Sequence, residues 1–302
     1  MSFFKLLEKH FVIVFLLAIA IGFSFPKLGA FSFITPFMFA LAIFLASLKV
    51  DFRLFIKHLK DYKYFVKKFF IIKIIAPLLV FFITSLVAPQ FALAGLLIIA
   101  LPSGMSNIIF SDIFKGNNAL TLLFTVSTHL LSPIMIPFLV FLVSFQTIGF
   151  DYIGMFFSLT GIVLAPVILA YLVKKKFEAN VGKFAGHLSG INILLIAGIV
   201  VIIIAQNSGK LTDFYSFLWQ LGYAAIVYFI LSLFGFFVAR KESRENKIAI
   251  SLSTYHTNTI LGLFIASTYF SLEVVSVIIA AEFVADGYQA VYKMLLDKNI
   301  LK

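Results

Sequence analysis

Apolar runs long enough to cross a bilayer recur along the whole sequence, and they restrict the chain to a membrane fold. The 302 residues are 62% hydrophobic and only 12% charged. A run of about 18 or more apolar residues indicates a transmembrane helix, since a helix satisfies its own backbone hydrogen bonds in lipid. We count ten such runs, at about residues 11–25, 31–48, 69–87, 92–114, 118–145, 152–172, 187–206, 216–238, 248–270 and 274–293. The sequence therefore predicts an all-α polytopic membrane protein with ten transmembrane helices.

The basic residues behind the net charge of +11 are distributed along the sequence as in a membrane protein. If both termini are cytoplasmic, only Lys27 and Lys210 of the 24 basic residues face outward, and Lys73 lies within a span. This distribution follows the positive-inside rule. It predicts a multi-pass protein of the cytoplasmic (inner) membrane, with the lipid bilayer rather than nucleic acid as its partner. No small-residue cleavage site follows the first apolar run, so we expect that run to be the first span.

A polar, helix-breaking stretch, Leu101–Asn107, interrupts the apolar run 92–114. A Pro-Ser-Gly step at membrane depth frees backbone groups that lipid cannot satisfy. Broken helices near the bilayer centre are where secondary transporters bind ions and substrates, because helix ends carry partial charges. Ser106 and Asn107 add side-chain oxygens at this place. The stretch predicts an ion site; the alternative is a proline kink whose polar groups are hydrogen-bonded inside the bundle.

The chain also divides into two similar halves, residues 1–145 and 146–302, each with five expected spans. An odd number of spans gives the halves opposite orientations, as in inverted-repeat transporters. A second polar stretch, Ser251–Thr259, lies in the ninth span, and Asn107 and Asn258 are separated by half of the chain. We therefore expect two inverted five-helix repeats, with discontinuous fourth and ninth helices and a transport site where they meet.

The fourth and fifth spans resemble the bile acid:sodium symporter family. The residues that carry the resemblance are Pro102-Ser103-Gly104, Ser106-Asn107, Lys115-Gly116, Thr125-Val126-Ser127-Thr128 and Pro133. The resemblance implies a secondary active transporter of a small organic anion, bile acid-like, steroid-like or a carboxylate, that works by alternating access. It also implies a core domain of spans three to five and eight to ten, in which the fourth and ninth helices cross, a panel domain of spans one, two, six and seven, and substrate between them.

The resemblance further implies a first sodium site, formed by Ser106, Asn107, Thr121 and Thr125. Their hard oxygens suit an alkali cation, and the two threonines share one helical face. On the ninth span this sequence departs from the family, because Ser253 stands where a glutamate shared by two sodium sites is expected. Sodium dependence should therefore be weakened or altered. The other candidates are Ser253 and Thr257 for ion binding and, for substrate binding, Pro102, Gly104, Thr254, His256 and Asn258.

Three charged residues inside the expected spans, Lys73, Glu282 and Asp286, are candidates for coupling, because charges at membrane depth are usually functional. Lys73 lies within about a residue of the position of a family glutamine that binds a second sodium. Its ammonium would replace that ion and pair with Glu282 or Asp286, so that coupling runs on protons or is absent. Alternatively, Lys73 extends to the cytoplasmic interface and the two acids form a structural pair.

No metalloprotease, serine-hydrolase or nucleotide-binding motif is present, so we expect no enzyme and no cofactor beyond a possible sodium ion. The alternatives within transport are a proton-coupled or uncoupled carrier of the auxin-efflux-like or arsenite-carrier-like type. Outside transport, they are a receptor, a channel, or an intramembrane enzyme that uses Ser103 with His129 or His256. Neither the substrate's identity nor the oligomeric state follows from the sequence.

Overall fold

The computed structural model describes residues 6–7, 10–50, 62–144, 150–208 and 214–301, without the side chains at 11, 12, 62–64, 178–181, 183–186, 214 and 286. Within these residues the regular secondary structure is helical, and one isolated antiparallel bridge joins Ser103 to Thr257. Six helices are long and apolar enough to cross a membrane, or seven if a bent pair at 272–297 counts as one span. The protein is therefore an all-helical, multi-pass membrane protein.

The first, fourth and ninth expected spans are not single long helices. The first corresponds to α2 (Phe11–Ser24), which has only 14 residues. The fourth is divided into α7 (Ala92–Ala100) and α8 (Asn107–Ile113), and the ninth into α13 (Arg244–Tyr255) and α14 (Thr259–Tyr269). Both interruptions lie at the polar stretches where the sequence predicts them. Ten crossings in two inverted repeats stay a prediction, because only six or seven helices meet the length and hydropathy criteria.

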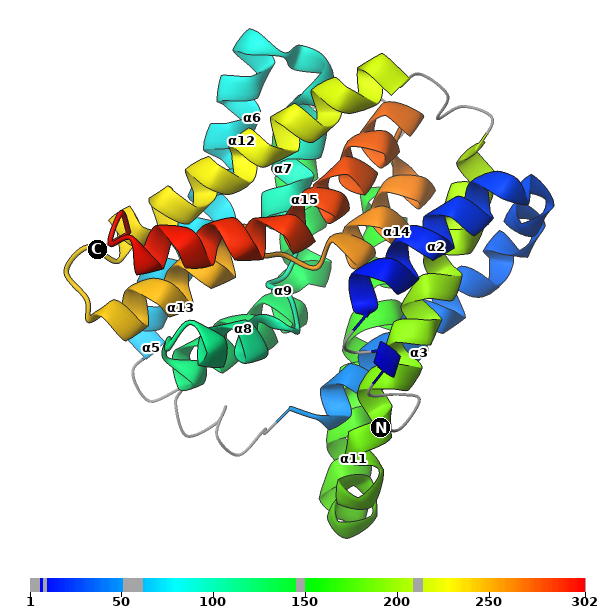
Figure 1. Cartoon of the computed structure of the whole chain (residues 1–302), viewed down its shortest axis with the longest axis horizontal. Helices are drawn as coiled ribbons and strands as arrows, with labels where there is room; N and C mark the ends of the chain where they lie inside the picture. The colour runs from blue at the N-terminus through cyan, green and yellow to red at the C-terminus, as the bar shows by residue number, and fades with distance from the viewer. Residues whose placement is uncertain (1–5, 8–9, 51–61, 145–149, 209–213, 302) are drawn as a thin grey trace. The chain divides into compact units, whose positions relative to one another are not determined.

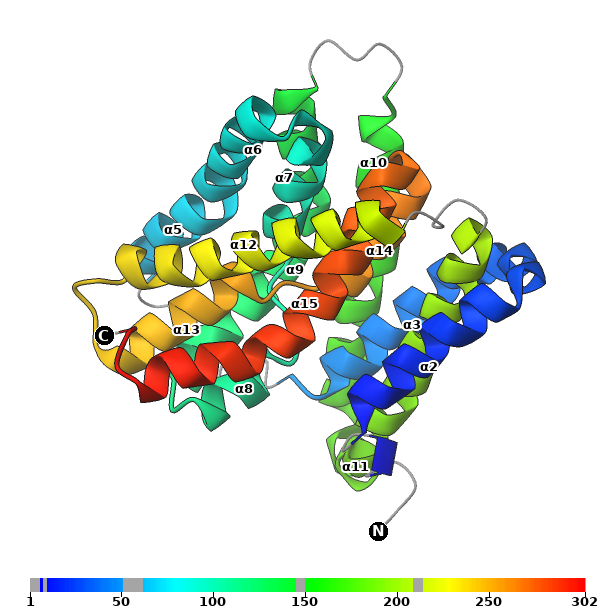
Figure 2. The same ribbon diagram turned by 45° about the horizontal axis from the view of Figure 1, so that its top comes forward.

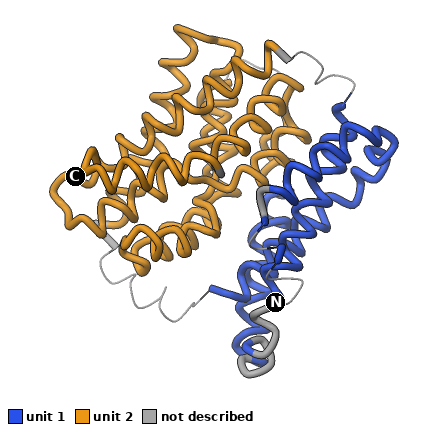
Figure 3. The backbone as a smooth tube through the Cα atoms, viewed as in Figure 1, with its two compact units in different colours: residues 1–50, 157–214 blue, residues 51–156, 215–302 orange. Residues whose placement is uncertain are grey.

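The chain forms two compact units, which Figure 3 colours separately. Unit 1 consists of residues 1–50 and 157–214. Its elements include α2, η1 (Pro26–Ile34), α3 (Thr35–Leu48), η5 (Thr160–Leu164) and the long α11 (Ala165–Asn207). Helix α11 packs against α2 and α3 and has non-helical backbone angles at Phe177. The Lys174 ammonium donates to Val50 O at 2.7 Å, and Lys49 donates to the Ser189 hydroxyl, so two lysines help to fix α11 within this unit.

Unit 2 consists of residues 51–156 and 215–302 and contains both interrupted helices (Figures 1 and 2). Besides α7, α8, α13 and α14, its elements are α5 (Tyr62–Phe70), η3 (Ile71–Ile75), α6 (Ala76–Val87), η4 (Pro89–Phe91), α9 (Asn118–Val143), most of α10 (Tyr152–Leu159), α12 (Phe214–Val238) and α15 (Leu272–Asp297). Helix α7 is almost completely buried, since every residue from Ala94 to Leu101 is buried. The predicted division into core and panel domains stays a prediction.

Two π-helical segments, Ile71–Ile75 and Thr160–Leu164, each end two residues before a proline. Pro77 and Pro166 have no backbone N–H, and each ring crowds the carbonyl four residues earlier, so the preceding turn widens. For Pro77 that carbonyl belongs to Lys73. The sequence thus places a distorted turn at Lys73, which is buried.

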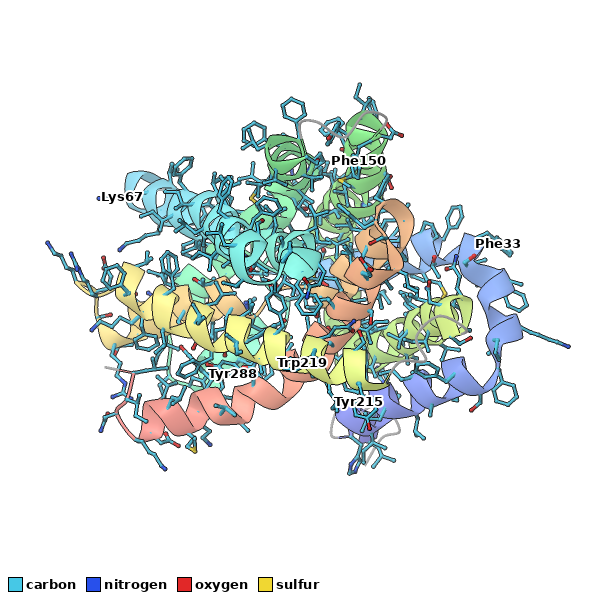
Figure 4. The ribbon with its side chains drawn as sticks, turned by 90° about the horizontal axis from the view of Figure 1, so that it is seen from above. Phe33, Lys67, Phe150, Tyr215, Trp219 and Tyr288 are labelled. Carbon is cyan, nitrogen blue, oxygen red and sulfur yellow. The ribbon has the colours of Figure 1, made fainter. Side chains whose placement is uncertain are left out.

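The exposed surface of the helices is apolar, as lipid contact requires. Large side chains such as Leu86 and Phe37 are 86% and 75% exposed. Tyr215 and Trp219, one turn apart near the start of α12 and labelled in Figure 4, are also largely exposed. Tyr and Trp are typical of the level where a membrane meets water. The first turns of α12 are therefore best placed at such an interface.

The close contact between α12 and α13 depends on Gly235. A Cβ at this position would lie 2.5 Å from Ser251 Cα, whereas a Cβ at Gly222 of the same helix would meet nothing within 4 Å. We predict that Gly235→Ala lowers the free energy of unfolding by about 1–3 kcal/mol through overpacking. Gly222→Ala should instead raise it slightly, by up to about 1 kcal/mol, because alanine favours helix. Thermal unfolding in detergent measures both; equal effects of the two variants would contradict the packing shown here.

Candidate functional site

The break between α7 and α8 follows from Pro102 and Gly104. A residue before proline is biased away from the helical region, and Leu101 has φ −54° and ψ 147°. At Gly104, a Cβ would lie 2.9 Å from His256 Nδ1. Only glycine therefore leaves room for the imidazole, which lies directly against the interrupted backbone.

The two breaks meet inside unit 2, where Figure 2 shows the connection from α7 to α8 close to the connection from α13 to α14. The Gly104 N–H donates to His256 O at 2.9 Å, and the Asn258 N–H donates to Pro102 O at 2.8 Å. These bonds flank the antiparallel bridge described above. Each break thus satisfies backbone groups of the other, which lipid could not do.

Two side-chain hydroxyl groups add to the hydrogen bonds between the two breaks. The Ser103 hydroxyl donates to Ser253 O at 2.9 Å, in the last turn of α13. The Thr257 hydroxyl donates to Ile98 O at 2.8 Å, in the last turn of α7. The last carbonyls of a helix have no donor within the helix. Each interrupted helix therefore has one of its terminal carbonyls capped by a side chain from the other break.

The four residues of the predicted first sodium site lie at the start of α8 and on α9. Ser106 is exposed, whereas Asn107, Thr121 and Thr125 are buried. The Thr125 hydroxyl is the informative group, because it is buried without a hydrogen-bond partner among the described residues. An unsatisfied hydroxyl oxygen is able to accept a cation. No described side-chain hydrogen bond joins the four residues to one another, so their convergence on one ion stays a prediction.

The Asn107 amide is held by the ninth-span break. Its Nδ2 donates to His256 O at 3.0 Å and to Leu252 O at 3.4 Å. Both amide hydrogens are therefore directed to carbonyls, and Oδ1 accepts a hydrogen bond from His256 Nδ1–H. The oxygen predicted to bind sodium is thus engaged by the imidazole in this conformation.

The second buried histidine, His129 on α9, forms a hydrogen bond with Asn258, as His256 does with Asn107. Its Nδ1 contacts Thr125 O at 2.8 Å, and because a carbonyl only accepts, Nδ1 carries the hydrogen. Its Nε2 then accepts from Asn258 Nδ2 at 3.3 Å. Asn258 Oδ1 accepts the Leu261 N–H at 3.1 Å and caps α14. Both histidines are therefore hydrogen-bonded interior residues that link each break to its surroundings.

Two predicted residues of the ninth span make bonds to their own helix. The Ser253 hydroxyl donates to Ala249 O at 2.8 Å, and the Thr254 hydroxyl donates to Ile250 O at 2.7 Å. Neither hydroxyl hydrogen is therefore directed at the opposite break in this conformation. Roles in ion or substrate binding stay predictions for both residues.

Lys73 is fully buried, and its ammonium lies at the end of α7 rather than extending to the protein surface. Nζ donates to Leu101 O at 2.9 Å and to Ile99 O at 3.2 Å. The interpretation of Lys73 as an interfacial lysine is therefore wrong. Glu282 is buried and accepts a hydrogen bond from the Thr259 hydroxyl at the start of α14. The side chain of Asp286 lies outside the described residues, and with it the predicted pairings of that acid.

Two hydroxyls of the site were missed by the sequence argument. Thr128 accepts the Ser103 N–H at 3.0 Å, and Ser111 accepts the Thr121 hydroxyl at 3.1 Å. Their spacing contained a signal, since Thr121, Thr125 and Thr128 follow one helical face and Ser111 is one turn after Asn107. The sequence contains no signal for the bonds from Lys73 to backbone carbonyls, because every residue has a carbonyl.

Comparison with known proteins adds to this geometry. Residues 36–214 match the Sodium Bile acid symporter family. An uncharacterized sodium-dependent transporter of Bacillus subtilis, YocS, is 29% identical over 83% of this chain and 79% of its own length. The protein YbaS of the same organism is 23% identical over 91% and 92% of the two chains. A probable sodium/metabolite cotransporter of Arabidopsis thaliana chloroplasts, BASS1, is 26% identical over 65% of this chain and 49% of its own length.

The hydroxyl caps predict a difference between two neighbouring serines. Ser103→Ala should lower the free energy of unfolding by about 1 kcal/mol, because Ser253 O then loses its donor. Ser106→Ala should change it by less than about 0.5 kcal/mol, since this serine is exposed and caps nothing. Thermal unfolding in sodium-free detergent solution compares the two variants. Equal losses would mean that the Ser103 bond does not hold the breaks together.

Proposed function

The chain belongs to the Sodium Bile acid symporter family, a family that includes sodium-dependent transporters, and on this basis we propose that it is a secondary active transporter. The proposed substrate is a small organic anion, and the proposed driving force is a monovalent cation gradient with weakened sodium dependence. The observation that carries the proposal is the meeting of two interrupted helices inside an apolar, lipid-exposed protein. Such paired breaks are the device by which secondary transporters bind ions and substrates.

An inverted repeat of ten spans is the proposed architecture. The reciprocal caps support it, because Ser103 and Ile98 in residues 1–145 exchange equivalent bonds with Ser253 and Thr257 in residues 146–302. We propose alternating access around the joined breaks. The distribution of lysine and arginine supports an orientation with both termini on the cytoplasmic side of the inner membrane.

The proposed cation site uses Asn107, Thr121, Thr125 and Ser106. Its main support is the buried Thr125 hydroxyl, which lacks a hydrogen-bond partner among the residues described. Asn107 Oδ1 would join the site when the His256 imidazole turns away. A neutral serine at position 253 offers less negative charge to an ion than a carboxylate does, and weak sodium binding is the expected result.

The proposed substrate class comes from the family description, which names bile acids, and from the start of α14 at the breaks. A helix N-terminus has a partial positive charge that favours carboxylates. We propose that Pro102, Gly104, Thr254, His256 and Asn258 contribute to the substrate site.

We predict that purified protein in liposomes takes up a bile acid or a small carboxylate without ATP when a cation gradient is imposed. The measurement is uptake of labelled candidates with sodium, potassium or a proton gradient, compared with protein-free liposomes. Uptake that follows none of these gradients would favour an uncoupled carrier. Failure of uptake and of exchange across the whole candidate set would contradict the proposed function.

A second prediction concerns the cation site. Thr125→Val keeps the shape of the side chain but removes the unpartnered oxygen, so it should reduce any sodium-dependent rise in Tm by more than half. Thr268→Val is the matched control, because the Thr268 hydroxyl bonds to Phe264 O of its own helix at 2.8 Å. Thermal unfolding over a sodium series, with choline replacing sodium, gives the comparison. A sodium effect that persists unchanged in Thr125→Val would place the ion elsewhere.

A further inference from the structure

Among the described residues, Lys73 and Glu282 are the buried side chains of Lys, Arg, Asp or Glu. Lys73 is also among the largest fully buried side chains of the protein. Burying a charge at membrane depth is costly unless the surroundings compensate for it. The position of this ammonium is therefore a feature that the fold must specifically support.

The break at Pro102 creates the acceptors that Lys73 uses. In a continuous helix, the N–H groups of residues 102 and 103 would bond to Ile98 O and Ile99 O. Pro102 has no N–H, and the Ser103 N–H is directed to Thr128 instead. Ile98 O is then capped by Thr257, while Ile99 O and the following Leu101 O accept from the Lys73 ammonium. The lysine thus completes the end of α7.

This location has the chemistry of a cation site. Backbone carbonyls are hard oxygen ligands of the kind that alkali cations use. The end of α7 also carries the negative partial charge of the helix dipole. An ammonium has three donors and satisfies such oxygens with hydrogen bonds. It also repels a second positive charge at the same place.

We propose that the Lys73 ammonium is a built-in cation that occupies the end of α7 and excludes a metal ion from it. The protein would then bind one exchangeable inorganic cation at most, at the Asn107 and Thr125 site. The inference deepens the proposed function and rests on it for the transport consequence, namely that no more than one inorganic cation moves per cycle. The occupancy of the α7 end can be tested without transport.

The local fold supports a fixed rather than a mobile lysine. Lys73 lies in the π-helical segment before Pro77, and π segments inside helices occur frequently at functional sites. Helix α6, which continues this segment, packs along α7. Lys73 is itself buried, and its acceptors lie at the end of the almost completely buried α7, so both belong to neighbouring elements of unit 2.

The first measurement is the number of sodium ions bound by wild-type protein, from equilibrium binding of radioactive sodium in detergent. We expect one ion per chain or fewer at saturation. Two ions per wild-type chain would overturn the proposal, and this outcome does not depend on the folding of any variant. Binding of no sodium would contradict the proposed sodium site at Thr125 but not the role of Lys73.

The second measurement compares Lys73→Gln with Lys67→Gln, a change at an exposed lysine on the same helix that Figure 4 labels. Glutamine removes the charge and supplies an amide oxygen, so Lys73→Gln should bind one more sodium per chain than wild type. The gain should persist when Thr125→Val is added, because it arises at a separate site. Lys67→Gln should bind as wild type does. A folded Lys73→Gln protein with no additional sodium would show that Lys73 is only a structural hydrogen-bond donor.

Discussion

The organisation of unit 2 depends on one constraint, which is that an interrupted helix in an apolar interior must find partners for its freed backbone groups. The two breaks solve this problem together. Gly104 and Asn258 donate backbone bonds across the contact, and the hydroxyls of Ser103 and Thr257 cap the helices on opposite sides. Either break alone would leave groups unsatisfied at a cost of several kcal/mol. The helices around them are consequently held by polar bonds at the centre and by apolar packing elsewhere.

The two breaks form equivalent bonds to each other but differ in charge. At the end of α7, a lysine ammonium donates to Ile99 O and Leu101 O. At the end of α13, the neutral Asn107 amide donates to Leu252 O and His256 O. The same requirement, donors for the last carbonyls of a helix, is thus met once by a cation and once by an amide. The two breaks therefore have different electrostatic environments.

The likeness to the Sodium Bile acid symporter family and the expected departures from it concern different features of the chain. The family relation covers residues 36–214, which include the first break and the polar residues that follow it. The departures expected from the sequence concern charge, at position 253, which holds a serine, and at position 73, which holds a lysine. The Ser253 hydroxyl bonds to Ala249 O of its own helix, and the Lys73 ammonium bonds to Leu101 O at the end of α7. The weakened sodium dependence proposed above rests on these two positions.

The sequence by itself determined the membrane-embedded helical class, the places of both breaks and most of the polar residues around them. Hydropathy and proline or glycine positions are local properties, so they could be found without coordinates. Other assignments needed the tertiary structure. The interfacial interpretation of Lys73 had to be replaced, and the engagement of Asn107 by His256 was not foreseen. Bonds such as Ser103 to Ser253 O and Thr257 to Ile98 O join residues about half the chain apart. Only the folded chain decides them, because many carbonyls compete for each donor and packing alone brings one pair within reach.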